Sequence, residues 1–195
     1  MRESEYAALQ LVTAPTVEPV ALSEAKANLR VDHSDDDTLI TACRDAARVY
    51  TEKILGKSLL SQVRKVTYEA NHIPNNGIVN IPFGPLISID SVKYYNSSDV
   101  LTTVSTDDYT TDLLGDRLKF DDLPNLEDRP NALEINYTAG YGTASTDVPT
   151  PIIQAVKFLT NHLYEQRVPV INGTISTPVP FTYNAILYPY TELLK

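Results

Sequence analysis

The chain has 195 residues, of which 43% are hydrophobic and 21% are charged, so it can bury the core of one domain or of two small ones. Its net charge of -9 argues against sequence-independent binding to nucleic acid, because that affinity comes from Lys and Arg side chains that neutralise phosphates. A single Cys excludes a disulfide framework, and no apolar run approaches the ~20 residues that a membrane-spanning helix needs. Without a secretory signal pattern, we expect an acidic, globular, intracellular protein.

The first part of the chain predicts an extended arm and a short helix. Residues 1–20 are weakly patterned, and Pro15 and Pro19 favour extended backbone. We expect this N-terminal arm to be ordered only where another segment or subunit holds it. Ser23 is then a suitable cap for a helix over Glu24–Leu29.

The strongest helical pattern covers Asp35–Gly56. Ser34 is a suitable N-cap, and Asp37 is placed to complete a capping box. Apolar residues recur at helical spacing and predict one buried stripe, namely Ile40, Cys43, Ala47, Tyr50 and Ile54, widened by Leu39, Ala46 and Val49. The opposite side is charged and is interpreted as a solvated helix surface, with Arg44, Arg48, Glu52 and Lys53 as its main members.

From Leu60 the pattern changes from helical to alternating, which is typical of strands. The predicted strands are Gln62–Tyr68, Ile78–Ile81, Leu86–Tyr95, Leu101–Val104, Tyr109–Thr111, Arg117–Phe120 and Ala132–Thr138. Turn-forming residues separate these short segments. The region therefore predicts an antiparallel sheet or a small barrel.

Helical spacing returns after Thr150, where Pro151 suits the first helical position, and continues to about Arg167. An extended loop is expected over Val168–Pro180. The closing segment is rich in large apolar groups, namely Phe181, Tyr183, Ile186, Leu187, Tyr188 and Tyr190. We therefore expect an α+β fold, in which residues 21–58 and 146–195 form a small helical bundle and residues 59–145 form an inserted β subdomain.

No residue pattern indicates catalysis or metal binding. The three His residues lack a His or Cys partner at ligand spacing, and Cys43 lies on a predicted apolar stripe. The acidic run over Asp32–Asp37 lacks the Gly and Glu that an EF-hand loop requires, so helix capping explains it better. We expect no enzyme, no metal and no cofactor. A carboxylate pair for glycoside hydrolysis stays open, because only spatial separation defines it.

Five stretches in a fixed order carry a family resemblance. They are Glu18–Val31 leading into Asp35–Gly56, then Ile81–Val92, Ile135–Gly142, Val148–Val156, and Val179–Phe181 with Leu187–Tyr190. Over residues 18–190 the chain resembles the head–tail connector family of long-tailed bacteriophages, whose members are also called adaptor or head-completion proteins. The inserted β subdomain departs from the smallest, all-helical members of that family.

The resemblance implies a structural subunit of the virion neck, assembled in the host cytoplasm. It implies a homo-oligomeric ring, nominally of about twelve copies, that docks on the portal protein and extends the DNA channel. A tail protein, or a stopper or tail-terminator protein, would attach on the other side. DNA would be cargo only, and neither a membrane nor a cofactor would be involved.

Two groups of residues are candidate contacts in such a ring. The apolar closing segment, Phe181, Tyr183, Ile186, Leu187, Tyr188 and Tyr190, either docks on the portal or folds back on its own bundle. The charged residues Arg44, Arg48, Glu52 and Lys53 are candidates for charge pairs between neighbouring subunits. The alternative function is another phage assembly component, such as a tail-completion or tail-terminator protein. An all-β fold without a packed helical pair would favour that alternative.

Overall fold

The computed structural model describes residues 6–166 and 181–191. The chain divides into two compact units, one with residues 16–60 and 142–195 and the other with residues 1–15 and 61–141. We call them the helical unit and the β unit. The described residues form helices early and late in the chain and antiparallel sheets between them, so the predicted α+β class is confirmed.

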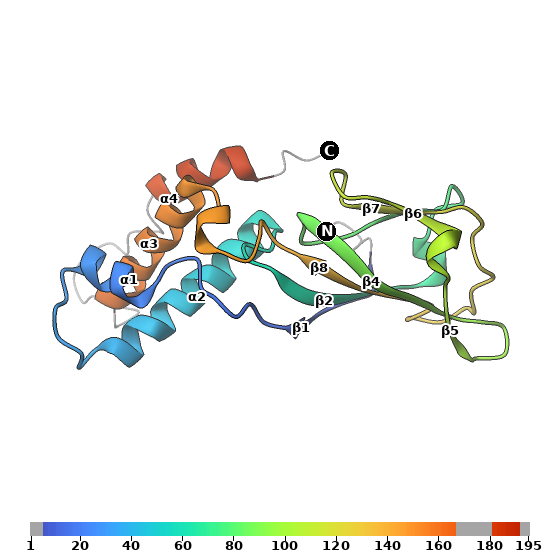
Figure 1. Ribbon diagram of the computed structural model, residues 1–195, viewed down its shortest axis with the longest axis horizontal. Coiled ribbons are helices and arrows are strands. Elements are labelled where there is room, and N and C mark those ends of the chain that lie inside the picture. The colour runs from blue at the N-terminus through green and yellow to red at the C-terminus, as the bar shows by residue number, and fades with distance from the viewer. Residues whose placement is uncertain (1–5, 167–180, 192–195) are drawn as a thin grey trace, which may run out of the picture. The chain divides into compact units, whose positions relative to one another are not determined.

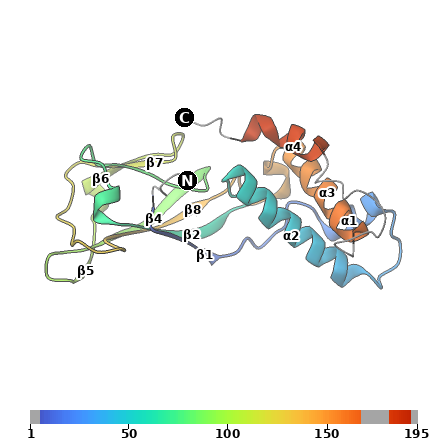
Figure 2. The ribbon, with the colours of Figure 1, turned by 180° about the vertical axis from the view of Figure 1, so that it is seen from behind.

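The helical unit contains α1 (Leu22–Leu29), α2 (Asp37–Leu55), α3 (Thr150–Glu165) and α4 (Phe181–Leu187), which a short 3-10 turn over Tyr188–Tyr190 follows. Helix α2 packs along α3, α1 contacts both, and α4 lies against α3 (Figures 1 and 2). Fully buried aliphatic side chains fill the space between them, including Val20, Ile40, Ala47, Leu59, Ile152 and Val156. This is the packing that the apolar stripes of α2 and α3 predict.

The start of α2 differs from the prediction, whereas its end agrees. Ser34 offers only its backbone carbonyl, which accepts a hydrogen bond from the Asp37 N–H at 3.1 Å. The Asp37 carboxylate binds the Lys26 ammonium at 2.6 Å instead of closing a capping box, so that prediction is wrong. An ion pair with α1 has replaced the local cap. At the other end, Gly56 takes the left-handed conformation (φ +62°) that terminates a helix.

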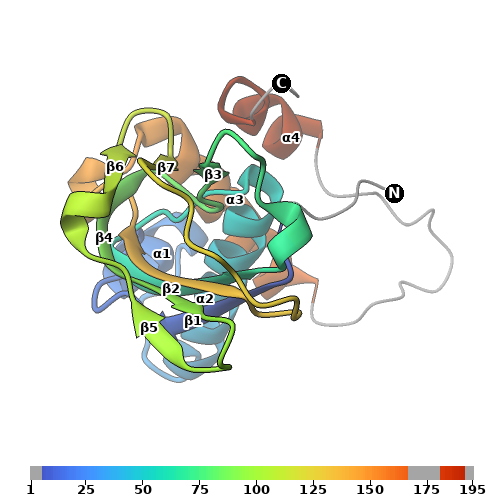
Figure 3. The ribbon, with the colours of Figure 1, turned by 90° about the vertical axis from the view of Figure 1, so that its right-hand side faces the viewer.

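The β unit contains β1 (Ala8–Thr13), β2 (Gln62–Tyr68), β3 (Ile78–Asn80), β4 (Leu86–Tyr95), β5 (Leu101–Thr103), β6 (Tyr109–Asp112), β7 (Arg117–Phe120) and β8 (Leu133–Ala139). One sheet has the order β1-β2-β8-β4-β5 and the other β3-β7-β6, with every pair antiparallel. Figure 3 shows the smaller sheet above and the larger one below within this unit. Both sheets are open. Of the two predicted alternatives, the antiparallel sheet is therefore confirmed and the small barrel is not.

A single apolar core lies between the two sheets. The larger sheet contributes Val66, Val92 and Ile135, and the smaller one contributes Val79, Leu118 and Phe120, all of them at most 3% exposed. The alternation in β2 and β7 places these side chains on one face of each strand, as the period of two predicts.

The segment expected to be part of an extended arm forms an edge strand instead. Leu9 lies opposite Val66, and Leu11 opposite Arg64, in the antiparallel pair of β1 with β2. The sequence gives little sign of this, because most of β1 is exposed and lacks the alternation of a half-buried strand. Its hydrogen bonds to β2, rather than its burial, define it.

Candidate interaction surfaces

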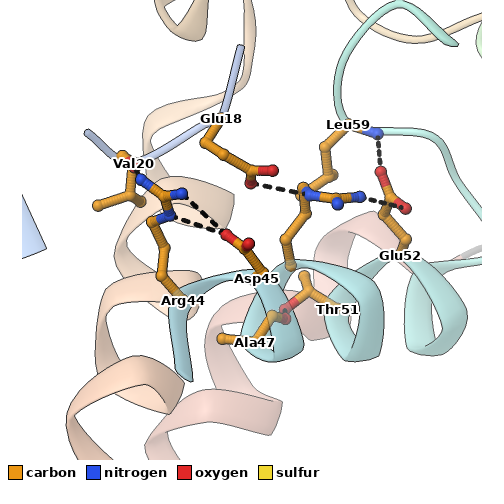
Figure 4. A network of polar contacts seen from close by, with 9 residues as sticks. Glu18, Val20, Arg44, Asp45, Ala47, Thr51, Glu52 and Leu59 are labelled. Atoms are coloured by element: carbon orange, nitrogen blue, oxygen red, sulfur yellow. Dashed lines mark hydrogen bonds and ion pairs between the residues drawn. The ribbon is translucent and has the colours of Figure 1, made fainter. Parts of the chain in front are cut away.

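A buried ionic network ties α2 to the segments on either side of it (Figure 4). The Arg48 guanidinium donates from Nε to Glu18 at 2.8 Å and from Nη1 to Glu52 at 3.3 Å. The second oxygen of Glu52 accepts the backbone N–H of Leu59 at 3.1 Å. Arg48 is 8% and Glu52 is 3% exposed, so the network is internal to the helical unit.

The four charged residues of α2 that are candidates for contacts between subunits therefore have different environments. The solvated-surface interpretation is wrong for Arg48 and Glu52, because both are buried in the network. Arg44 is half-buried and donates to the Asp45 carboxylate at 2.9 and 3.0 Å. Lys53 is exposed. Helical spacing alone could not separate these cases, since the partner Glu18 lies 30 residues away in sequence.

Burial raises the pKa of the Glu18 carboxyl above its ordinary value. Loss of hydration is the largest cause, and the attraction of the Arg48 guanidinium opposes it without overcoming it. Arg48 thus holds Glu18 in a site where ionisation carries a cost. The network links Glu18, α2 and Leu59 within Thr16–Leu60, and buried ion pairs of this kind add little net stability.

The closing segment folds back on its own unit over residues 181–191. Tyr183 is 1% exposed, and its hydroxyl lies 3.0 Å from the Thr51 Oγ1 of α2. Its ring contacts the ring of Tyr50 at a centroid distance of 6.1 Å, and Leu187 is likewise 1% exposed. Burial raises the pKa of the Tyr183 phenol, opposed by its hydrogen bond with Thr51.

The six candidate docking residues therefore divide into two groups. Tyr183 and Leu187 belong to the core of the helical unit. Tyr188 is 62% exposed, while Ile186 and Tyr190 are half-buried. The side chain of Phe181 and the residues 167–180 and 192–195 lie outside the described part of the chain. Of these six candidates, only Tyr188, Ile186 and Tyr190 offer side-chain surface to a partner in the described residues.

An exposed apolar stripe along α2 was missed by the sequence analysis. Val49, Tyr50 and Ile54 are 41%, 43% and 44% exposed, and Ala42 and Ala46 extend the line toward the N-terminus of the helix. Tyr50 and Ile54 were predicted to lie on the buried stripe, and Ala46 and Val49 were predicted to widen it. All four are exposed, so these assignments are wrong. We call the exposed residues Ala42, Ala46, Val49, Tyr50 and Ile54 the α2 stripe. In the sequence, the helical spacing of Ala42, Ala46 and Val49, with Lys53 at the margin, marks this second face.

In residues 6–166 and 181–191, no group of three His, Cys, Asp or Glu side chains is placed to hold a metal ion. Cys43 is buried on the inner side of α2, as the apolar spacing predicts. Within the same residues, no helix combines the length and apolarity that a membrane crossing requires.

Comparison with known proteins connects the fold to a family. Residues 19–114 match the model of the family described as phage gp6-like head-tail connector protein. The match covers α1, α2 and the strands β2–β6, and it confirms the resemblance that the sequence stretches carry. No curated protein matches the chain.

Solved structures of similar fold come from gene transfer agent particles. A chain in the neck of an empty gene transfer agent particle, computed with C6 symmetry, superposes with a TM-score of 0.76 and 21% identity over 94% of both chains. A chain from the virion of the native gene transfer agent particle gives 0.72 and 21% over 93% and 94%. A chain in the neck of the native particle, computed with C12 symmetry, gives 0.72 and 20% over 94% of both chains. These likenesses show that the chain shares the fold of those proteins over 93–94% of its length.

Proposed function

From the match of residues 19–114 to the phage gp6-like head-tail connector family, we propose that this chain is a structural subunit of a phage neck. In this proposal it forms a ring on the portal vertex, extends the DNA channel and provides the platform for the tail. The fold likeness to chains of gene transfer agent necks supports the same placement. The protein would act in the virion after assembly in the host cytoplasm, and it would act without catalysis.

The ring is proposed to have twelve copies. The neck with C12 symmetry that contains a chain of this fold supports that number. A cyclic ring joins two different surfaces of each subunit, so an apolar patch on one subunit meets another surface of its neighbour. The α2 stripe is the apolar surface that we assign to this contact, while Arg44 and Lys53 remain candidates for charge pairs at its margin.

Portal docking is assigned to the exposed part of the closing segment. Tyr188 is the most exposed aromatic side chain among the described residues, and Ile186 and Tyr190 lie within two positions of it. Tyrosines of this kind are enriched among residues that dominate protein interfaces. Tyr183 and Leu187 are assigned the different role of holding α4 on the rest of the helical unit.

The packed pair α2 and α3 favours the neck subunit over the alternative component. A tail-completion or tail-terminator protein would be favoured by an all-β fold without packed helices, and the described residues contain packed helices. Helix α2 lies within residues 19–114, which match the family model, and it packs on α3, which lies outside the matched residues.

The experiment is to measure the mass of the purified protein alone and with the portal protein of the same phage, followed by particle imaging of the complex. We expect a ring of about twelve subunits on the portal. Docking is then tested with Tyr188→Ser, which leaves the core of the helical unit intact, and with Val17→Ser as a control, since Val17 is 46% exposed in the same unit. A strict monomer that ignores portal and tail proteins would contradict the proposed function. Unchanged portal binding by Tyr188→Ser would contradict only the docking assignment.

A further inference from the structure

Strand β1 is bound to the β unit almost entirely through its backbone. Five of its six residues are exposed, and only Leu9 is half-buried, packed with Tyr6 against the apolar core. Among the described strands β1 pairs with β2 only, and the pairing begins where the Ala7 N–H donates to the Thr67 carbonyl at 2.8 Å. Because so little side-chain surface is buried, separating β1 from β2 costs little free energy compared with opening the core.

The chain is anchored again a few residues after β1. The Glu18 carboxylate accepts a hydrogen bond from Arg48 Nε at 2.8 Å, and Val20 is fully buried in the helical unit. Thr13 and this anchor are separated by residues 14–17, and the boundary between the two units lies directly after Pro15. Pro15 favours extended backbone in the residue before it, so the connection is a short and extended hinge. A short hinge next to a terminal element is where copies of a chain exchange that element.

The edge of β2 specifies its own occupant, because the structure shows the sequence that fits it. Ala8 lies opposite Thr67, and Leu9 lies opposite the buried Val66. The same segment of a second copy would make these pairs unchanged, so an exchange of β1 between copies loses no contact of the pair. Residues 6–16 also carry no charged side chain, so they can move to a neighbour of net charge -9 without adding charge repulsion.

We propose that β1 is exchanged between neighbouring subunits of the ring, so that Ala8–Thr13 of one subunit pairs with β2 of the next. This inference rests on the proposed function, because a ring holds a neighbour beside each subunit at a high effective concentration. A single subunit keeps β1 on its own β2. In the ring, the donated strand and the accepting edge are two different surfaces of each subunit, as a closed cyclic contact requires.

The test places pairs of thiols across the strands in a Cys43→Ala background, which removes the native thiol. Ala8→Cys/Thr67→Cys joins positions that lie directly opposite in the β1–β2 pair, within the range of a disulfide. Val63→Cys/Thr138→Cys is the matched control, because it joins opposite positions of β2 and β8, which stay paired within one chain. Each protein is oxidised as a dilute subunit and as rings assembled on the portal of the same phage. Denaturing gels without reductant then separate single chains from joined chains.

We expect Ala8→Cys/Thr67→Cys to form disulfides within single chains in the dilute subunit and a ladder of covalently joined chains in the rings. The control should give single chains in both states. A mixture of Ala8→Cys chains with Thr67→Cys chains, assembled into rings together, should give joined pairs that mass spectrometry identifies by the linked peptides of positions 8 and 67. The mixture needs one new thiol per chain, so it tests the exchange even where the double variant does not assemble.

Three outcomes would overturn the inference. Rings on the portal in which Ala8→Cys/Thr67→Cys forms disulfides only within single chains reject the exchange and leave the proposed function standing. A ladder of equal extent in the control pair also rejects it, because oxidation would then join chains irrespective of β1. A protein that forms no ring with or without the portal contradicts the proposed function and the inference together.

Discussion

Arg48 is the residue on which the ionic arrangement of the helical unit depends. It lies between the carboxylates of Glu18 and Glu52, and all three side chains are largely removed from water. A buried charge pair of this kind returns little net stability, but the loss of one partner leaves the others uncompensated. The arrangement therefore makes the segment before α1 dependent on a side chain in the middle of α2.

Arg48→Ala is expected to lower the free energy of unfolding of the helical unit by about 3–5 kcal/mol, because two buried carboxylates lose their cation. The triple change Glu18→Gln/Arg48→Met/Glu52→Gln removes all three charges and should be far less destabilising. Urea denaturation followed by circular dichroism measures both. Equal losses in the two variants would show that packing of the Arg48 stem, rather than charge, is what matters.

Glu18 makes the stability of the helical unit depend on pH. Its pKa is raised in the folded state, so the folded protein holds this proton more tightly than the unfolded chain does. Its contribution is fully present below the ordinary pKa of 4.5 and is lost as the pH rises through the raised value. Relative to Glu18→Gln, the wild type should lose stability as the pH increases from below 4.5 toward neutrality. Paired thermal unfolding curves measure the difference, and a wild-type advantage that grows with pH would reverse the sign and refute the explanation.

At the scale of the element, α2 has two faces with different roles. The inner face packs on α3, and the outer face carries the α2 stripe, whose small residues Ala42 and Ala46 allow another backbone to approach closely. A helix that is apolar on its solvent side usually marks an interface. This is why the ring contact was assigned there and not to Arg48 or Glu52.

Val49→Asp should weaken self-association by about tenfold or more, because an interface centre tolerates a buried unpaired charge poorly. Val17→Asp is the matched control, since it places the same charge at a valine of similar exposure in the same unit (46% against 41%). Analytical ultracentrifugation over a range of protein concentrations compares the two. If both variants assemble as the wild type does, the α2 stripe is not the ring contact.

The elements were largely predictable from local pattern, whereas the surfaces were not. Strands such as Gln62–Tyr68, Leu86–Tyr95 and Arg117–Phe120 were predicted with their observed bounds, because alternation and turn residues are local signals. The burial of Arg48 depends on the region of Glu18, which is distant in sequence. Tyr50 stays 43% exposed although its ring contacts Tyr183 of α4, a residue that helical spacing within α2 cannot reveal. Edge strand β1 was missed for the same reason, since only its pairing with β2 defines it.

At the scale of the whole molecule, the net charge of -9 argues against a nucleic-acid binder. In a ring it acquires a second consequence, because each added subunit brings a net charge of -9 against its neighbours. The proposed contact is apolar, and an apolar contact gains nothing from low salt. Electrostatic repulsion and apolar association should thus oppose each other at low ionic strength.

We therefore expect the ring to form more readily as sodium chloride is raised from about 0.01 M to about 0.5 M, as the screening length shrinks from roughly 30 Å toward a few ångströms. Sedimentation of the protein without portal, at one protein concentration and several salt concentrations, measures the ring fraction. Val49→Asp adds a charge at the contact. The difference between its ring fraction and that of the wild type should therefore become smaller as salt rises, without disappearing. A ring that dissociates as salt rises would mean that ion pairs, with Arg44 and Lys53 as the first candidates, hold the neighbours together in place of the α2 stripe.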